Sequence, residues 1–153
     1  MKRAIYPGTF DPITLGHISV IKRARRIFDE VLVAVADSSL KQPMFDIDTR
    51  VKMAKNSLSY LDGVEVKPFH SLLVKFCQEN DIKTIIRGLR AVSDFEYELQ
   101  IGYANASLDK NIDTIYLMPS LEHAFISSTV VRDIIRHGGD ASHLVPKEVL
   151  EYV

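Results

Sequence analysis

Four stretches of this sequence carry side chains suited to binding phosphate groups. The first, residues 7–17, contains Thr9, Thr14, Gly16 and His17. Thr14 can cap a following helix, and His17 then lies in the first helical turn, where unpaired backbone N–H groups attract anions and an imidazole can donate to a phosphate oxygen. A capped turn with a surface histidine is the alternative. The position of this stretch between a strand and a helix favours phosphate binding.

Two further stretches supply cations. Lys41 lies in a polar loop, residues 37–43, where it either contacts a phosphate or is solvated. Arg87 and Arg90 stand on either side of Gly88 at the end of an apolar run, so their guanidinium groups would make a positive pocket for an anion. In the alternative, downstream carboxylates neutralise the two arginines; the candidates are Asp94, Glu96 and Glu98.

The fourth stretch, residues 125–132, places Ser127, Ser128 and Thr129 ahead of Arg132. One of the three hydroxyl groups is expected to cap the helix that begins there. Together with Arg132 they also suit a second phosphate site on the other half of the molecule. The four stretches indicate a polyphosphate ligand, a nucleotide, with a second phosphate-bearing partner.

Common motifs of other nucleotide-binding and catalytic sites are missing from the sequence. It has no Gly-x-x-x-x-Gly-Lys-Ser/Thr loop, no Gly-x-Gly-x-x-Gly fingerprint, no Gly-x-Ser-x-Gly elbow and no carboxylate or histidine spacing typical of a metal cage. Cys77 is the only cysteine, which excludes an internal disulfide, and its apolar neighbours predict a small buried side chain.

Composition narrows the class of protein. The chain has 153 residues, 46% of them hydrophobic, and a formal net charge of −1, so it is long enough for one core and has no overall field that would attract nucleic acid or anionic lipid. No apolar run approaches the roughly 20 residues that span a bilayer, and the N-terminus lacks a signal-peptide core. We expect a soluble, cytoplasmic, unprocessed protein. The basic cluster Arg23, Arg25 and Arg26 is expected to be a solvated helix face rather than a nucleic-acid patch.

The elements that position these stretches alternate between two kinds. Short runs rich in branched residues predict five strands, and the second run is apolar throughout, which is typical of a parallel sheet covered on both faces; the runs are 4–6, 31–36, 64–66, 84–86 and 114–118. Helical spacing lies between them, as in the stripe Val20, Ile21, Ala24, Ile27 and Phe28. The pattern predicts one doubly wound, Rossmann-like α/β domain over residues 1–153, with the ligand at the carboxyl ends of the strands.

Helix boundaries are also marked in the sequence. Asp46 is a suitable N-cap for a second helix. A third helix begins with Leu72, Leu73 and Phe76, and a fourth is marked by Phe95, Leu99 and Ala106. A fifth helix is expected to stop at Gly138–Gly139, and Pro146 suits the first turn of a short terminal helix.

The motifs as a group resemble a known family. Residues 14–17 (Thr-Leu-Gly-His) are similar to the T/H-x-G-H signature of the nucleotidyltransferase superfamily, and residues 126–132 (Ile-Ser-Ser-Thr-x-x-Arg) to its second signature. The longer blocks 6–12 and 86–98 resemble the bacterial phosphopantetheine adenylyltransferases, and the resemblance extends over essentially the whole chain.

This resemblance implies transfer of the adenylyl group of ATP to 4′-phosphopantetheine, giving dephospho-coenzyme A and pyrophosphate. It implies that His17 stabilises the transition state, that Lys41 is a second catalytic residue, and that phosphopantetheine is held by Thr9, Lys41, Leu73 and Arg87. The residues that it implies for ATP are Thr9, Phe10, His17, Gly88, Leu89, Arg90, Glu98, His123, Ala124, Phe125, Ile126, Ser127, Ser128 and Thr129. It further implies Mg²⁺, a homohexamer and feedback binding of coenzyme A.

The chemistry of such a transfer agrees with the absence of a catalytic dyad, because the attacking phosphate is already ionised and needs alignment and charge stabilisation rather than a strong base. We expect His17 at the α-phosphate, Lys41 between the two substrates, and Mg²⁺ carried by the nucleotide without a protein cage. Position 123 departs from the family, where a larger aromatic is more usual. Alternatives are a cytidylyltransferase, a nicotinamide mononucleotide adenylyltransferase, or a non-catalytic ATP-binding module.

Overall fold

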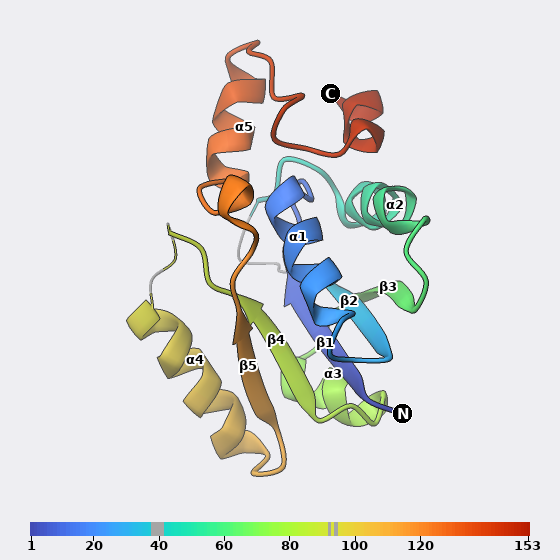
Figure 1. Cartoon of the computed structure of the whole chain (residues 1–153), viewed down its shortest axis with the longest axis vertical. Coiled ribbons are helices and arrows are strands. Elements are labelled where there is room, and N and C mark those ends of the chain that lie inside the picture. Colours follow the sequence, from blue (N-terminus) through green and yellow to red (C-terminus); the bar gives the residue numbers. More distant parts are fainter. Residues whose placement is uncertain (38–41, 92, 94) are drawn as a thin grey trace.

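A five-stranded parallel sheet of order β3-β2-β1-β4-β5 forms the centre of the molecule (Figure 1). The computed structural model describes residues 1–37, 42–91, 93 and 95–153. The strands are β1 (Arg3–Gly8), β2 (Glu30–Ala36), β3 (Val64–Phe69), β4 (Thr84–Gly88) and β5 (Asp113–Leu117). The predicted doubly wound, Rossmann-like α/β fold with five parallel strands is confirmed, and β1, β3 and β4 run further toward their carboxyl ends than the apolar runs indicate.

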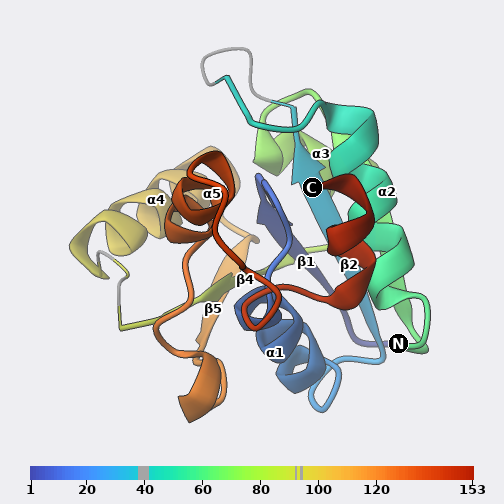
Figure 2. The ribbon, with the colours of Figure 1, turned by 90° about the horizontal axis from the view of Figure 1, so that it is seen from above.

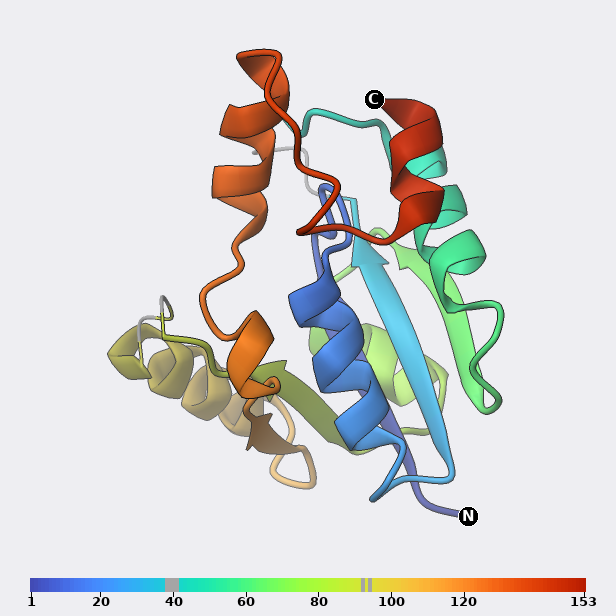
Figure 3. The same ribbon diagram turned by 45° about the horizontal axis from the view of Figure 1, so that its top comes forward.

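Helices cover both faces of the sheet. They are α1 (Leu15–Ala24), α2 (Ile47–Leu58), α3 (Leu73–Glu79), α4 (Phe95–Leu108) and α5 (Ser128–Arg136), with 3₁₀ turns η1 (Leu121–His123) and η2 (Lys147–Tyr152). Seen from above the carboxyl ends of the strands, α1 and α2 lie on one face, α3 lies behind the other, and α4 flanks β5 (Figure 2). The segment from α5 to η2 passes over the top of α1 and brings η2 against α2 (Figure 3).

Alternation along the strands divides the core into two layers. In β1, Ala4 and Tyr6 face the layer that contains α1 and α2, whereas Ile5 faces the layer that contains α3. Cys77 belongs to the α3 layer and is fully buried, and burial raises the pKa of its thiol to about 11. The prediction of a small buried cysteine is therefore confirmed.

The expected helix caps are present. Thr14 caps α1, Asp46 caps α2 through a 2.8 Å bond from the Thr49 amide, and Ser127 caps α5 through a 3.1 Å bond from the Val130 amide. The third helix begins at Leu73, the fifth ends one residue before His137 and is followed by Gly138 with φ +72°, and η2 begins after Pro146.

The stripe predicted for the first helix is wrong at its end. α1 stops at Ala24, and Ile27 is 48% exposed. The chain leaves the helix because the Arg25 guanidinium donates to the Phe28 and Asp62 carbonyl oxygens, which closes a turn against the loop before β3. Arg25 thus has a structural role, unlike the solvated side chain expected for it.

The order of the strands in the sheet determines where a ligand site is expected. Helical crossovers run outward in both directions from the centre of the sheet, so the order reverses between β1 and β4, which pair through Ile5 and Ile85. A parallel sheet leaves an open crevice at the carboxyl ends of the two strands on either side of that reversal. Among the described residues, no helix is both long and apolar enough to cross a membrane.

Candidate active site

A cleft of about 170 Å³ opens where β1 and β4 end, and we call it the rim cleft. Its walls come from the ends of the two strands, the loop after β1, the first turns of α1 and one residue of α4. Six residues predicted for the site line it together: Thr9, His17, Arg87, Gly88, Arg90 and Glu98. The structure therefore brings the first and third stretches of the sequence into one site.

His17 is oriented by its own helix terminus. The Thr14 hydroxyl accepts a hydrogen bond from the His17 amide at 3.3 Å, and the Thr14 amide donates to His17 Nδ1 at 3.0 Å, which is a reciprocal capping box. Because a backbone N–H can only donate, Nδ1 must be the unprotonated nitrogen, and a neutral ring then carries its hydrogen on Nε2. A residue in the cleft wall thus has a fixed N–H donor.

The surroundings keep this imidazole neutral. Burial lowers the pKa of His17 to about 3, and the positive charges of Arg90 and Arg87 act in the same direction. The ring also packs edge-on against Phe10, with 4.8 Å between ring centroids. At neutral pH, His17 is therefore a hydrogen-bond donor and not a cation.

Phe10 occupies a strained position beneath His17. Its φ is +50°, in the left-handed region that a bulky residue rarely adopts, and its side chain is almost completely buried. The ring packs against both His17 and Tyr6, the latter at a centroid separation of 5.5 Å. Packing therefore stabilises the turn, and only the backbone of Phe10 remains for the ligand contact that the resemblance implies.

Arg50 supports the loop after β1 through buried hydrogen bonds, and the spacing of residues in the sequence did not indicate this role. Arg50 is 1% exposed, and its guanidinium donates to the carbonyl oxygens of Phe45, Thr9 and Ala36 at 2.8–2.9 Å. Asp11 is buried beside it and accepts from the Met44 and Phe45 amides. These groups join the loop after β1 to the end of β2 and to the start of α2.

Arg87 is paired with Glu98 across the cleft. Arg87 Nε and Nη2 donate to the two carboxylate oxygens at 2.9 and 2.8 Å, a bidentate contact, and Nη1 donates to the Pro7 carbonyl at 3.3 Å. Burial alone would lower the pKa of Arg87, but hydrogen bonding to Glu98 and its charge raise it overall. Of the acidic residues considered as neutralising partners, Glu98 takes that position for Arg87.

Arg90 joins the cleft to the segment after β5. Its Nη1 donates to the Ile126 carbonyl at 2.7 Å, and the Ala91 amide donates to the Ala124 carbonyl at 3.1 Å. A Cβ added at Gly16 would lie 3.5 Å from the His123 carbonyl oxygen, so this segment also lies against the first turn of α1. Residues 123–126 therefore lie against Arg90 and Gly16 at the η1 end of the cleft, although none of them lines the cleft itself.

The hydroxyl groups at the start of α5 already have partners in the chain. Ser127 caps the helix, Ser128 donates to the Pro12 carbonyl at 3.1 Å, and Thr129 accepts from Arg132 Nη2 at 3.2 Å. Arg132 Nη1 also donates to the Asp11 carbonyl at 2.8 Å. These contacts hold α5 against the loop after β1, and the second phosphate site expected there stays a prediction.

Leu73 is a predicted site residue that the structure does not bring to the cleft. Leu73 lies at the start of α3 and packs on the α3 core layer, and it does not line the rim cleft. Lys41, the second predicted catalytic residue, lies outside the described residues, so its role stays a prediction. Leu89 follows β4 directly, where its amide donates to the Leu117 carbonyl at 2.8 Å.

Tyr6 is a cleft residue that sequence reasoning missed. Its hydroxyl lies 3.5 Å from the place a Cβ would take at Gly88, where such a Cβ would also crowd Val20 of α1 at 3.0 Å. Burial raises the pKa of Tyr6 to about 12, so the hydroxyl stays protonated. The signal was available, because Tyr6 is the last aromatic of the first strand and precedes the phosphate-type loop directly.

The part of the chain that the structure describes contains no group of three or more His, Cys, Asp or Glu side chains placed to hold a metal ion. Glu98, the carboxylate in the rim cleft, is paired with Arg87. These residues do not fit a protein-held Mg²⁺, and no chemical step is assigned to one.

Similarity to known proteins shows the family of this chain. Residues 5–134 match the cytidylyltransferase-like family. The chain is 60% identical to the phosphopantetheine adenylyltransferase of Nautilia profundicola over 149 residues, 97% of each chain, and 61% identical to that of Campylobacter curvus over 97% of this chain and 96% of the other. A protein from Vibrio parahaemolyticus described as a nicotinate-nucleotide adenylyltransferase shares the fold, with a TM-score of 0.74 at 24% identity over 99% of this chain and 91% of its own. This chain belongs to the phosphopantetheine adenylyltransferase family of nucleotidyltransferase enzymes.

Proposed function

We propose that the rim cleft carries out the reaction of this family on ATP and 4′-phosphopantetheine. The phosphate of 4′-phosphopantetheine attacks the α-phosphorus of ATP, the bond to the β-phosphate oxygen breaks, and dephospho-coenzyme A and pyrophosphate leave. The observation that carries the proposal is the fixed Nε2–H donor of His17 at the β1/β4 reversal, beside Arg87 and Arg90. The catalytic problem is to align two anions, which such donors address.

His17 donates from Nε2 to an α-phosphate oxygen, where charge accumulates during the displacement. The capping box presets this donor, so no reorientation of the ring is needed in the transition state. Its low pKa means that the ring keeps the same neutral form through the physiological pH range. Phosphate contacts from the Thr9 and Phe10 backbone would lie at the end of β1, next to this donor.

Arg87 and Arg90 divide the remaining anionic charge. Arg90 faces the η1 end of the cleft, so it is assigned to ATP, and the hydroxyl groups from Ser127 to Thr129 are assigned to the β- and γ-phosphates. Arg87 is assigned to the phosphate of phosphopantetheine, and Lys41 to both phosphates. Because Glu98 satisfies Arg87 in the absence of substrate, phosphate binding must share or replace part of that ion pair.

Mg²⁺ is assigned to the nucleotide and supplies charge neutralisation on the triphosphate. Leu73 and the other residues that the resemblance implies for phosphopantetheine keep that assignment. The reaction is placed in the cytoplasm, and coenzyme A, which resembles the product, is proposed to compete for the cleft.

A homohexamer is also part of the proposal. Support comes from α4, which buries none of its own residues against the described part of the chain and leaves Phe95, Tyr103 and Leu108 more than half exposed. A second copy of the chain would cover such a face. Sedimentation equilibrium should give six times 17.3 kDa, and a monomer mass at micromolar concentration would contradict this.

The reaction is tested by pyrophosphate release. ATP with 4′-phosphopantetheine and Mg²⁺ should release pyrophosphate and form dephospho-coenzyme A in equal amounts. CTP in place of ATP, nicotinamide mononucleotide in place of phosphopantetheine, and omission of the acceptor are the control arms. Greater release in the CTP or mononucleotide arm would identify another nucleotidyltransferase, and ATP binding without release in any arm would identify a non-catalytic module.

A further inference from the structure

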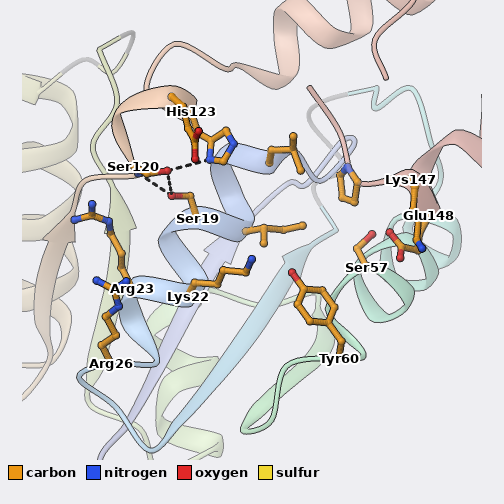
Figure 4. A pocket seen from close by; sticks show the side chains of 14 residues that line it. Ser19, Lys22, Arg23, Arg26, Ser57, Tyr60, Ser120, His123, Lys147 and Glu148 are labelled. Carbon is orange, nitrogen blue, oxygen red and sulfur yellow. Dashed lines mark hydrogen bonds between the residues drawn. The ribbon is translucent and has the colours of Figure 1, made fainter. Parts of the chain in front are cut away.

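A second cavity, of about 380 Å³, lies between α1, α2, η1 and η2, and we call it the α1–η1 cavity (Figure 4). It shares no lining residue with the rim cleft, whose volume is about 170 Å³. Its size falls in the range of about 300–1,000 Å³ that is typical of small-molecule sites. The reaction proposed above takes place in the rim cleft and leaves this cavity without a role.

One wall of the α1–η1 cavity presents an oriented imidazole. The Ser120 amide donates to Ser19 Oγ at 2.7 Å, and the two serine hydroxyl oxygens lie 3.0 Å apart. Ser120 Oγ also lies 3.0 Å from His123 Nδ1. Because Nδ1 is bonded within the chain, Nε2 is the ring nitrogen that is left for a ligand. Figure 4 shows the His123 ring directed into the cavity from η1.

Lys22 brings a positive charge to the same wall. It lies three residues after Ser19 on α1, so the two side chains are neighbours on one helix face. Its ammonium group lies 5.4 Å from the centre of the Tyr60 ring, a cation–π contact that holds it at the cavity. Within the described residues, neither Lys22 nor Lys147 of η2 forms an ion pair. Both charges are therefore available to an anion.

The α2 wall contains a polar group without a partner in the part of the chain that the structure describes. The Ser57 side chain is fully buried, and its hydroxyl makes no hydrogen bond there. Native structures rarely leave such a group unpaired, so the cavity has room and a reason for a further molecule. Figure 4 shows Ser57 and Glu148 on the side of α2 and η2, across from His123.

The charges around the α1–η1 cavity favour an anionic ligand. Basic side chains outnumber acidic ones in its lining, with Lys22, Arg23, Arg26 and Lys147 against Glu122 and Glu148. A concave surface with an excess of one sign of charge attracts ligands of the opposite sign.

We propose that the α1–η1 cavity is a second ligand site that binds a phosphate monoester, with the phosphate between Lys22 and His123. The three terminal oxygens of a phosphate can accept from the ammonium group and from Nε2–H at the same time. The cavity is larger than a phosphate alone requires, and Leu15, Ile18 and Pro146 give it apolar surface for the rest of the ligand. The site does not depend on the reaction proposed for the rim cleft.

Two residues of α1 with methyl groups report separately on the two sites. Ile18 lines the α1–η1 cavity, and Val20 lines the rim cleft. In methyl NMR of the whole protein, phenyl phosphate should give saturable shifts at Ile18. Inorganic phosphate and benzoate, which each lack one half of this probe, should bind more weakly there. Shifts confined to Val20, or binding of either control as tight as that of phenyl phosphate, overturn the proposal.

Variants then locate the phosphate. Lys22→Ala should raise the dissociation constant measured at Ile18 roughly tenfold or more, as expected for the loss of a charged hydrogen bond. Lys55→Ala is the matched control, because it removes an exposed lysine of α2 that does not line the cavity. An unchanged affinity in Lys22→Ala, or an equal loss in Lys55→Ala, contradicts the proposal. Lys22→Ala should keep the pyrophosphate release of the wild type, so failure of the proposed function and failure of this site are separate results.

Ser120→Ala tests the orientation of His123. Without the Ser120 hydroxyl the ring is released, and the dissociation constant for phenyl phosphate should rise roughly two- to tenfold, the range for one hydrogen bond. Ser107→Ala removes a hydroxyl that donates to the Ala104 carbonyl away from the cavity and should leave the affinity unchanged. The same affinity in both variants would remove His123 from the site.

Discussion

The loop before α1 and the η1 segment each carry a histidine whose Nδ1 makes a hydrogen bond within the chain. His17 receives that bond from a backbone amide three residues away. His123 Nδ1 lies 3.0 Å from Ser120 Oγ, and Ser120 is in turn hydrogen-bonded to Ser19 of another element, 101 residues distant in the chain. One histidine is thus oriented by local structure and the other by tertiary contact.

The two regions also differ in the contacts that hold them in place. The loop before α1 rests on Arg50 and Asp11, whose hydrogen bonds are made to backbone groups deep in the fold. The η1 segment is partly exposed and is joined to α1 through two hydroxyl groups. Substitutions of the buried charged groups that support the first region should therefore lower stability. Substitutions of the two hydroxyl groups that support the second region should instead affect ligand binding.

The largest effect is expected from Arg50→Ala. Removing a fully buried guanidinium takes this donor from three carbonyl oxygens and a positive charge from the surroundings of Asp11, and losing one partner of a buried charged network costs about 3–5 kcal/mol. The free energy of unfolding from denaturant titration should fall by this amount. Arg26→Ala, at an exposed arginine of the same basic cluster as Arg25, is the control and should change it by less than about 0.5 kcal/mol. Similar values for both variants would remove the structural role of Arg50.

His17→Ala should have the next largest effect, on turnover. Loss of a donor aimed at developing charge typically costs about 2.7–4 kcal/mol in the barrier, a fall in kcat of about 10²–10³-fold, while KM for ATP changes little. Steady-state pyrophosphate release measures both quantities. His143→Ala, at an exposed histidine, should behave as the wild type. A near-normal kcat for His17→Ala would leave the capping box as the only role of this residue.

The pH dependence of stability gives a further test of the surroundings of His17. The folded-state pKa of His17, about 3, lies below the ordinary value of 6.5, so protons bind preferentially to the unfolded chain. Stability from neutral His17 is complete above pH 6.5 and falls as pH drops from 6.5 toward 3, by at most about 1.4 kcal/mol per pH unit.

Unfolding titrations of the wild type and His17→Gln at pH 7, 6, 5 and 4 measure this contribution. As the pH falls, the wild type should lose more unfolding free energy than His17→Gln, since the carboxylates affect both proteins alike. Parallel curves would mean that His17 titrates normally.

Much of the fold could be predicted because its signals are local. The five strands were visible as apolar runs, and the caps at Thr14, Asp46 and Ser127 followed from single side chains. The end of α1 was missed because the apolar spacing continues through Ile27, while the Arg25 contacts that end the helix come from a loop near residue 62. Local spacing therefore predicts where an element begins more securely than where packing makes it end.

The candidate site divides in the same way. The sequence indicated Thr9, His17, Arg87 and Arg90 because residue types with free donors followed directly after predicted strands. It left open whether carboxylates neutralise the arginines, and only the folded chain pairs Arg87 with Glu98 from the facing helix. Arg50 gave no motif, because an arginine in an amphipathic helix is ordinary until its neighbours are known.

The amino-acid order by itself determined the parallel sheet, the family and the cap of α1 at Thr14, because strand periodicity and a helix cap need only residues close together in the chain. Tertiary structure decided which guanidinium groups are paired with other groups of the protein and which face the cleft, and it decided the orientation of His123. The reason is physical: a hydrogen-bond partner that lies 101 residues away becomes available only when α1 and η1 pack together.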